Sequence, residues 1–260
     1  MADDLRTGRR GWAAARDRRA SRSGSEAHPM VHSHRDLTGG ALRAAIFGVS
    51  DGLVSNVSLV LGTSGAHPGG GFVRLAGLAG LFGGSFSMAA GEYVSMRGQR
   101  EVLERELDIE RTELADRPAA EQSELEHIYV RRGLQPDIAR QVASELMSDP
   151  EMALATHARE ELGIDPHALG APVKAAVTSF VTFGLGALVP LLPFLGASSS
   201  SSTILISIAL TAAAAIGVGA ALSALTNRPR WYSALRSLGI CAAAGALTYG
   251  IGSLIGVSTG

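Results

Sequence analysis

Two stretches of the chain, 41–96 and 172–260, consist mainly of Ala, Leu, Ile, Val and Gly in long runs. A helix needs about 20 apolar residues to cross the roughly 30 Å hydrocarbon core of a bilayer. The runs have this length and predict five membrane spans, at residues 42–64, 73–95, 172–195, 203–225 and 235–257. The expected fold class is therefore all-α, a polytopic membrane protein with five transmembrane helices.

Pairs of glycines four residues apart recur in these runs, at Gly48 and Gly52, Gly80 and Gly84, and Gly252 and Gly256. Small residues at this spacing lie on one side of a helix and let two transmembrane helices approach closely. Glycine is also more frequent in transmembrane helices than in soluble ones. The pairs therefore predict close helix–helix contacts inside the membrane.

The links between the predicted spans differ in their content of basic residues, which sets the orientation of a membrane protein. Arg35 and Arg43 flank the first span on its N-terminal side, and three arginines lie in the link 227–236. The link after the third span, 196–202, carries no charge. This distribution predicts that the N-terminus and the segment 97–168 are cytosolic and that the C-terminus is outside.

Residues 1–40 are polar and rich in arginine, and they lack the apolar core of a signal peptide. We therefore expect a disordered, basic cytosolic tail. His28, His32 and His34 lie in this tail. We interpret them as incidental polarity of a disordered segment rather than as a metal site.

The segment between the second and third spans is too polar to enter lipid, because residues 97–165 include 17 acidic residues against nine arginines. Apolar residues recur among these charges with a helical period. Pro118 marks a break, Gly133 a stop and Pro136 the start of another helix, and a last helix is expected to run up to Asp165. The segment is predicted to be an acidic helical lobe whose first helix continues directly from the second span. The expected organisation has four parts: the tail 1–40, the first two spans in 41–96, the cytosolic lobe 97–168 and the last three spans in 169–260.

Acidic residues of the lobe recur at spacings that place them on common helix faces. The three sets are Glu106, Glu110 and Glu113; Glu121 and Glu124; and His157 and Glu161. Like charges at these spacings repel each other, and a divalent cation bound between them would remove the repulsion. The alternative is a solvated face whose acids pair with nearby arginines.

Asp51 and Glu92 are the two acidic residues that lie within apolar runs. A charge at the centre of a bilayer costs about 2.5–3.5 kcal/mol on insertion scales, so such a residue is by default a functional hypothesis. Asn56 lies close to Asp51 along the chain, and Met88 lies four residues before Glu92. Carboxylate, amide and thioether groups together suit a divalent transition metal. The alternatives are a structural hydrogen bond for Asp51 and simple helix packing for Met88.

Two motifs carry a resemblance to a known family. They are DGLVSNVSLVLGTSGA, from Asp51 to Ala66, and GGSFSMAAGEYVSMRGQRE, from Gly83 to Glu101. Together with the acidic lobe between the second and third spans, they make residues 41–260 resemble the vacuolar iron transporter family.

The resemblance implies a five-span homodimer that exports Fe²⁺, Mn²⁺ and similar ions from the cytosol in exchange for protons. It implies a transport path lined by Asp51 and Met88, to which the residues themselves add Glu92 and Asn56. It also implies a metal site in the lobe formed by Glu110, Glu113, Glu121, Glu124 and Glu161. The family has Met one turn before the last of these acids, where this chain has His157, so the substitution bears on metal selectivity. Metal ions, protons and the bilayer are the expected partners; no resident cofactor, no nucleic acid and no enzymatic activity are expected.

Two other functions are compatible with the same residues. A membrane-anchored di-iron ferroxidase would oxidise Fe²⁺ in the lobe, but such a site needs two Glu-x-x-His motifs, and the lobe has one, from Glu124 to His127. A passive metal channel gated by the acidic lobe would use the same pore residues as an antiporter. The strong preference for arginine over lysine, with Lys174 as the single lysine, indicates a GC-rich bacterial genome and hence a bacterial plasma membrane.

Overall fold

The computed structural model describes residues 40–66, 69–196, 200–226 and 228–259. The described residues form eight helices and no strand, which confirms the all-α fold class. The helices are α2 (Gly40–Gly65), α3 (Gly70–Asp116), α4 (Pro118–Arg131), α5 (Pro136–Leu146), α6 (Pro150–Glu160), α7 (Pro172–Gly196), α8 (Ser201–Thr226) and α9 (Arg230–Thr259). The predicted tail, with His28, His32 and His34, lies outside the described residues.

Five of these helices, α2, α3, α7, α8 and α9, are long and apolar enough to cross a membrane. They begin and end within a few residues of the predicted spans, except that α3 is much longer. Hydropathy locates such helices well because burial in lipid requires a continuous apolar run. The chain is therefore an integral membrane protein with five transmembrane helices.

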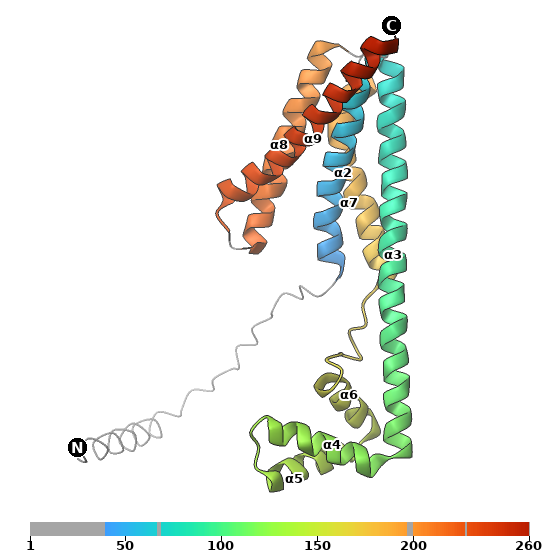
Figure 1. The fold of residues 1–260 in the computed structure, drawn as a ribbon, viewed down its shortest axis with the longest axis vertical. Coiled ribbons are helices and arrows are strands. Elements are labelled where there is room, and N and C mark those ends of the chain that lie inside the picture. Colours follow the sequence, from blue (N-terminus) through green and yellow to red (C-terminus); the bar gives the residue numbers. More distant parts are fainter. Residues whose placement is uncertain (1–39, 67–68, 197–199, 227, 260) are drawn as a thin grey trace, which may run out of the picture. The chain divides into compact units, whose positions relative to one another are not determined.

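Helix α3 joins the membrane part of the protein to the lobe without a break. Its 47 residues correspond to roughly 70 Å at 1.5 Å per residue, about twice the thickness of the hydrocarbon core. Its apolar part ends near Ser95, and beyond that point ion pairs one turn apart join Arg97 to Glu101 and Arg100 to Glu104. Figure 1 shows α3 continuing past the end of α7 to reach α4, as the sequence predicted.

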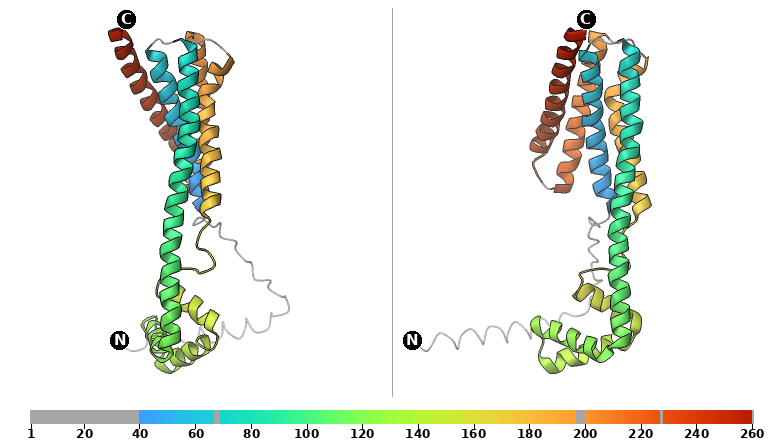
Figure 2. Two further views of the ribbon diagram at one scale, coloured as in Figure 1. Left: turned by 90° about the vertical axis from the view of Figure 1, so that its right-hand side faces the viewer. Right: turned by 45° about the vertical axis from the view of Figure 1, so that its right-hand side comes forward.

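Helix α2 is the centre of the membrane part, because it packs against α3, α7, α8 and α9. Helices α2 and α7 pack against each other, and both pack against α3 (Figure 2). The α2–α7 contact depends on glycine: a Cβ atom at Gly52 would overlap the carbonyl oxygen of Phe183, and one at Gly186 would overlap that of Val49. Near the C-terminal end of α2, a Cβ atom at Gly252 of α9 would likewise overlap the carbonyl oxygen of Gly62. The glycine spacing thus predicted these close contacts correctly.

The lobe consists of the last part of α3 and the short helices α4, α5 and α6. Proline occupies the first turn of α4, α5 and α6, where its missing N–H is not needed. Gly133 ends the α4 region with φ 98°, as expected for a stop. The predicted extension of the last helix to Asp165 is wrong, because α6 ends at Glu160 and Gly163 turns the chain with φ 67°.

Candidate metal centre

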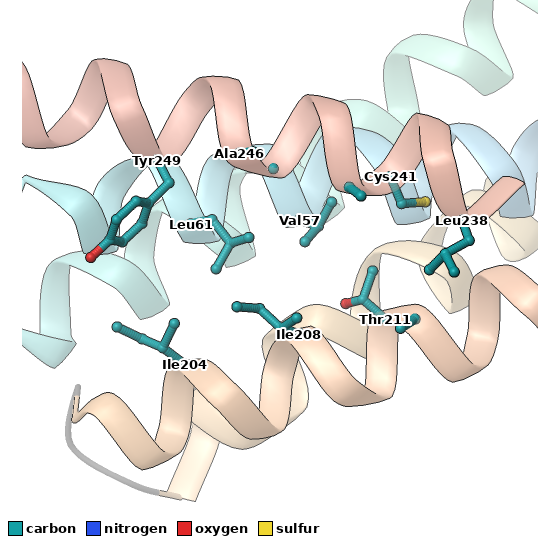
Figure 3. Close-up of a pocket in the computed structure, with 12 residues that line it drawn as sticks. Val57, Leu61, Ile204, Ile208, Thr211, Leu238, Cys241, Ala246 and Tyr249 are labelled. Atoms are coloured by element: carbon teal, nitrogen blue, oxygen red, sulfur yellow. The ribbon is translucent and has the colours of Figure 1, made fainter. Parts of the chain in front are cut away.

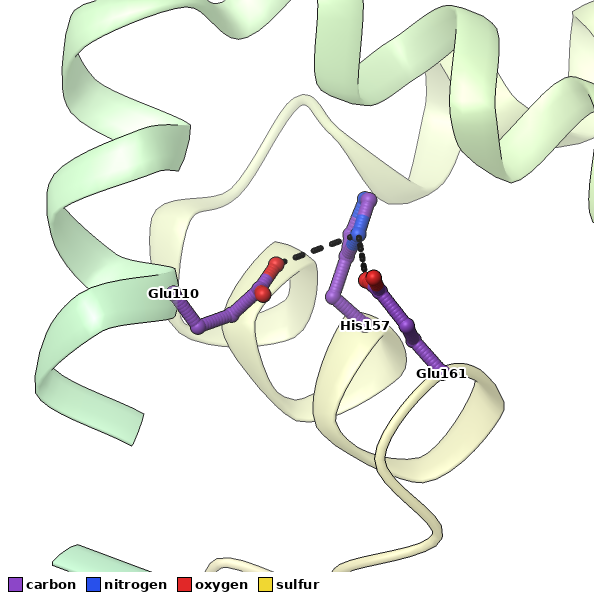
Figure 4. Close-up of side chains that lie close together, drawn as sticks. All are labelled: Glu110, His157 and Glu161. Atoms are coloured by element: carbon purple, nitrogen blue, oxygen red, sulfur yellow. Dashed lines mark ion pairs between the residues drawn. The ribbon is translucent and has the colours of Figure 1, made fainter. Parts of the chain in front are cut away.

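Three potential metal ligands of the lobe converge on one point. Glu110 of α3, His157 of α6 and Glu161, the C-cap residue of α6, each place one ligand atom within 4.8 Å of the others. The Nδ1 atom of His157 lies 3.2 Å from Oε1 of Glu110 and 3.8 Å from Oε2 of Glu161. Figure 4 shows the two carboxylates turned toward the imidazole from opposite sides. Glu121 of α4 adds a fourth group, with Oε2 3.9 Å from the same nitrogen. We call these four residues the lobe cluster.

Three residues of the lobe cluster, Glu110, Glu121 and His157, are buried, whereas Glu161 is exposed. The His157 side chain is 0% exposed and that of Glu110 is 5% exposed. Both ring nitrogens of His157 and Oε1 of Glu110 have no hydrogen-bond partner. Buried polar atoms are nearly always paired with protein or water, and leaving one unpaired costs about 1–3 kcal/mol. These three atoms lie in one place and form a donor set that a bound cation would satisfy.

The electrostatics of the lobe cluster favour a positive ligand. Glu110 lies well beyond Ser95, where the apolar part of α3 ends, and is therefore outside the membrane-crossing part of this helix. Burial and the negative charges of Glu161 and Glu121 raise the pKa of Glu110 to about 7. Burial, followed by the charge of Glu124, likewise raises the pKa values of Glu121 and Glu161. Burial lowers the pKa of His157, although the charge of Glu161 acts in the opposite direction. The lowered pKa favours the neutral imidazole that a metal requires.

Local structure explains how residues from three helices meet. The break at Pro118 redirects the chain, so that Glu121 in the first turn of α4 lies 3.9 Å from His157 of α6. A carboxylate in this position also interacts favourably with the helix dipole. Asp149 caps α6 by accepting hydrogen bonds from the backbone N–H groups of Glu151 and Met152. This cap fixes the start of α6, and the last turn then carries His157 toward Glu110.

Glu113 and Glu124, the remaining predicted ligands, lie at the edge of the lobe cluster. Both are exposed. Their negative charges contribute to the raised pKa values of Glu110, Glu121 and Glu161, so they are within electrostatic reach. The structure thus brings Glu110, Glu121, His157 and Glu161 together and leaves Glu113 and Glu124 facing solvent beside them.

The single Glu-x-x-His motif does not contribute to the lobe cluster through its histidine. His127 is exposed, and its Nδ1 lies 2.6 Å from the backbone oxygen of Ser123 in the same helix. Within the described residues, the one group of three or more clustered metal-ligating side chains is that of Glu110, His157 and Glu161. This arrangement differs from the pair of motifs that a di-iron bundle uses.

The four predicted path residues lie in two different environments of the membrane part. Asp51 is exposed on the surface of the single chain and accepts a 3.0 Å hydrogen bond from the Ser55 hydroxyl. Met88 is half-buried. Asn56, by contrast, is buried between helices and donates its amide to the backbone oxygen of Ala187. Asn56 is therefore not brought together with Asp51.

Glu92 has a partner that the sequence reasoning missed. Its carboxylate lies 3.1 Å from the guanidinium of Arg43, in the first turns of α2. The glutamate side chain is 15% exposed and that of the arginine 55%. The pair depends on the antiparallel register of α2 and α3, and no local pattern in the sequence reveals that register.

A cavity of about 430 Å³ lies between α2, α8 and α9. Figure 3 shows its lining of apolar side chains, including Val57, Leu61 and Ile208, beside Cys241 and the hydroxyl of Thr211. The lining contains no acidic residue and no histidine. Cys241 is the one strong transition-metal ligand in this lining, whereas the lobe cluster offers four ligands, so the lobe cluster remains the candidate metal centre.

The chain is also similar to known proteins over most of its length. Residues 42–253 match the VIT family model. Vacuolar iron transporter 1 of Oryza sativa subsp. japonica is 31% identical over 237 residues, which cover 91% of this chain and 94% of that protein. Vacuolar iron transporter 1 of Eucalyptus grandis is 30% identical over 225 residues, covering 86% and 90%. A vacuolar iron transporter of Acanthamoeba castellanii is 40% identical over 155 residues, covering 60% of this chain and 56% of that protein. The extent of these matches, together with the five spans, shows that the chain belongs to the vacuolar iron transporter family.

Proposed function

We propose that this protein transports Fe²⁺, Mn²⁺ and similar divalent ions out of the cytosol in exchange for protons. The observation that carries the proposal is the lobe cluster: ligand atoms of buried Glu110 and His157 and of exposed Glu161 lie within 4.8 Å of one another. Glu110 and His157 also have buried polar atoms without a hydrogen-bond partner. A site of this chemistry selects a cation over a neutral molecule. Membership of a family whose relatives are named iron transporters supports iron as one substrate.

The path begins in the cytosolic lobe. The excess of negative charge in 97–165 raises the local concentration of cations there. The lobe cluster, with Glu113 and Glu124 beside it, then takes the metal from water. Imidazole and carboxylate groups together bind iron, manganese and zinc, so His157 is expected to shift the preference relative to a methionine at this position.

The metal next reaches the face of the membrane part that carries Asp51 and Met88. Helix α3 links the two regions directly, because it holds both Glu110 and Met88. An exposed carboxylate in an apolar span is costly against lipid. A second copy of the chain facing Asp51 would enclose it in a polar path, which supports a homodimer. Protonation of Asp51 after metal release would return the path to its resting state.

The orientation and the membrane belong to the same proposal. The basic links favour a cytosolic N-terminus and lobe and an outside C-terminus. Composition favours a bacterial plasma membrane. The transported metal is the substrate, and no resident cofactor and no enzymatic step are required.

The direct test is metal uptake into proteoliposomes that hold the full-length protein with the lobe facing outward. Fe²⁺, Mn²⁺, Co²⁺ and Zn²⁺ are supplied separately, with and without an internal acid pH. Fe²⁺ uptake that increases with the proton gradient supports antiport, whereas uptake independent of the gradient identifies a passive channel. Absence of Fe²⁺ uptake together with consumption of oxygen on adding Fe²⁺ would identify a ferroxidase instead.

A further inference from the structure

The ion pair between Arg43 and Glu92 lies at the inner end of the face proposed for transport. Arg43 lies within the first turns of α2, which begins at Gly40, and Glu92 lies one helical turn beyond Met88 on α3. Phe47 and Asp51 follow Arg43 at intervals of four residues, along one stripe of α2. Arg43, Phe47 and Asp51 are all exposed on the single chain.

Two contacts fix the relation of α2 to α3 at this face. Arg43 meets Glu92, and deeper in the membrane a Cβ atom at Gly80 would lie 2.7 Å from Oδ1 of Asn56. The helices therefore run antiparallel. In this register, Met88 lies one turn deeper than the ion pair and Asp51 about two turns, or roughly 12 Å, deeper. An ion that moves from the lobe to Asp51 passes the ion pair first.

Helix stability does not explain the position of Arg43. A cation near the N-terminus of a helix is disfavoured by the helix dipole, and α2 has no acidic residue in its first turn. The partner is instead a carboxylate on another helix that is largely shielded from solvent. Neutralising that carboxylate removes the charge that would otherwise attract a dication at the mouth of the path.

We propose that Arg43 is a positioning residue that gates the path: its guanidinium holds Glu92 until an arriving divalent cation displaces it and takes Glu92 as a ligand. This inference rests on the proposed function. Arg43 and the transported cation compete for Glu92, and this competition sets the apparent affinity for the metal. The guanidinium is 55% exposed on the single chain, so its own chain leaves room for it to turn away from Glu92.

The test measures KM and maximal rate for Fe²⁺ in the proteoliposome assay. Arg43→Gln frees Glu92, and we expect KM to fall roughly two- to fivefold, the range for a partly exposed ion pair. Glu92→Gln leaves an unpaired guanidinium that repels dications, and we expect KM to rise by roughly the same factor. The double variant should lie between the two singles. Salt screens exposed charges, so these differences in KM should shrink at high ionic strength. A change in KM caused only by the loss of a structural contact would not depend on salt in this way.

A matched control is the Arg140–Glu126 pair of the lobe, whose side chains are 65% and 21% exposed. Arg140→Gln should leave KM unchanged. An unchanged or raised KM in folded Arg43→Gln protein would overturn the gate. If Arg43→Gln does not accumulate as folded protein, Glu92→Gln carries the test, and an unchanged KM overturns it. These outcomes presuppose Fe²⁺ uptake by the wild type; without such uptake the proposed function itself fails.

Discussion

The Nδ1 atom of His157 lies 3.2 Å from Oε1 of Glu110, yet neither atom has a hydrogen-bond partner. Burial lowers the pKa of His157, and a neutral imidazole forms no ion pair with this carboxylate. Glu121 and Glu161 add further carboxylates within 4 Å of the same nitrogen. A cation placed among these groups would replace repulsion between carboxylates by attraction, so the cluster is better suited to binding than to stabilising the lobe.

Replacing Glu110 by Gln should separate binding from stability. The change keeps the size of the side chain but removes a buried charge, and we expect the affinity for Mn²⁺ to fall at least tenfold, since even outer hydrogen-bond partners of ligands are worth about 10–100-fold. Because the folded-state pKa of Glu110 is raised from 4.5 to about 7, the metal-free protein loses stability as the pH rises between these values, and the loss is complete at pH 8. The variant should therefore be as stable as the wild type, or more stable, at pH 8.

Isothermal titration calorimetry with Mn²⁺ measures the affinity, and thermal unfolding of the metal-free protein measures the stability. Glu145→Gln, at an exposed position of α5, is the control and should change neither. Unchanged Mn²⁺ affinity in Glu110→Gln would remove this carboxylate from the metal site.

Metal binding to the lobe should weaken as the pH falls. A carboxylate must lose its proton to bind a cation, and the pKa of Glu110 is raised from 4.5 to about 7. Between these two values the folded protein holds a proton that the metal must displace. We expect the apparent affinity to fall by up to roughly tenfold for each pH unit below 7, per proton displaced, and to change little between pH 7.5 and 8.5. Titrations at pH 6, 7 and 8 check this, and Glu110→Gln should show a weaker pH dependence; an equally steep profile in that variant would assign the titration to other groups.

The contact between α2 and α7 predicts a strong effect on stability. A methyl group at Gly52 would overlap the carbonyl oxygen of Phe183, and backbone atoms cannot move aside as a flexible side chain can. Gly52→Ala should therefore destabilise the protein by about 1–3 kcal/mol or more, measured as a lower unfolding temperature in detergent. Gly217→Ala, where an added Cβ meets no atom within 4 Å, is the matched control in α8. Equal unfolding temperatures for the two variants would contradict the close approach of the helices.

Features that depend on nearby residues could be predicted from the sequence, whereas those that depend on tertiary register could not. The five spans follow from continuous apolar runs, and the breaks at Pro118 and Gly133 follow from local backbone chemistry. Gly163 was an equally local stop signal, but the helical pattern around it suggested a longer α6. The spacing of Glu110 and Glu113 could not distinguish a buried ligand from a solvated one, because the packing of α6 on α3 decides this. The Arg43–Glu92 pair needed the register of two helices.

Asp51 provides the sharpest test of the proposed path. Its carboxylate is exposed in the single chain and has one hydrogen bond, from Ser55. Asn at this position keeps an oxygen that can accept that bond and avoids the cost of a charge in the membrane, about 2.5–3.5 kcal/mol on insertion scales. Asp51→Asn should therefore fold normally and bind Mn²⁺ in the lobe with unchanged affinity, while Fe²⁺ uptake by proteoliposomes is abolished. Thr63→Val, which removes a hydroxyl bonded to the backbone of Leu59 in the same helix, should leave uptake intact. If Asp51→Asn transports Fe²⁺ at the wild-type rate, the metal does not pass this carboxylate, and the path must lie elsewhere in the membrane part.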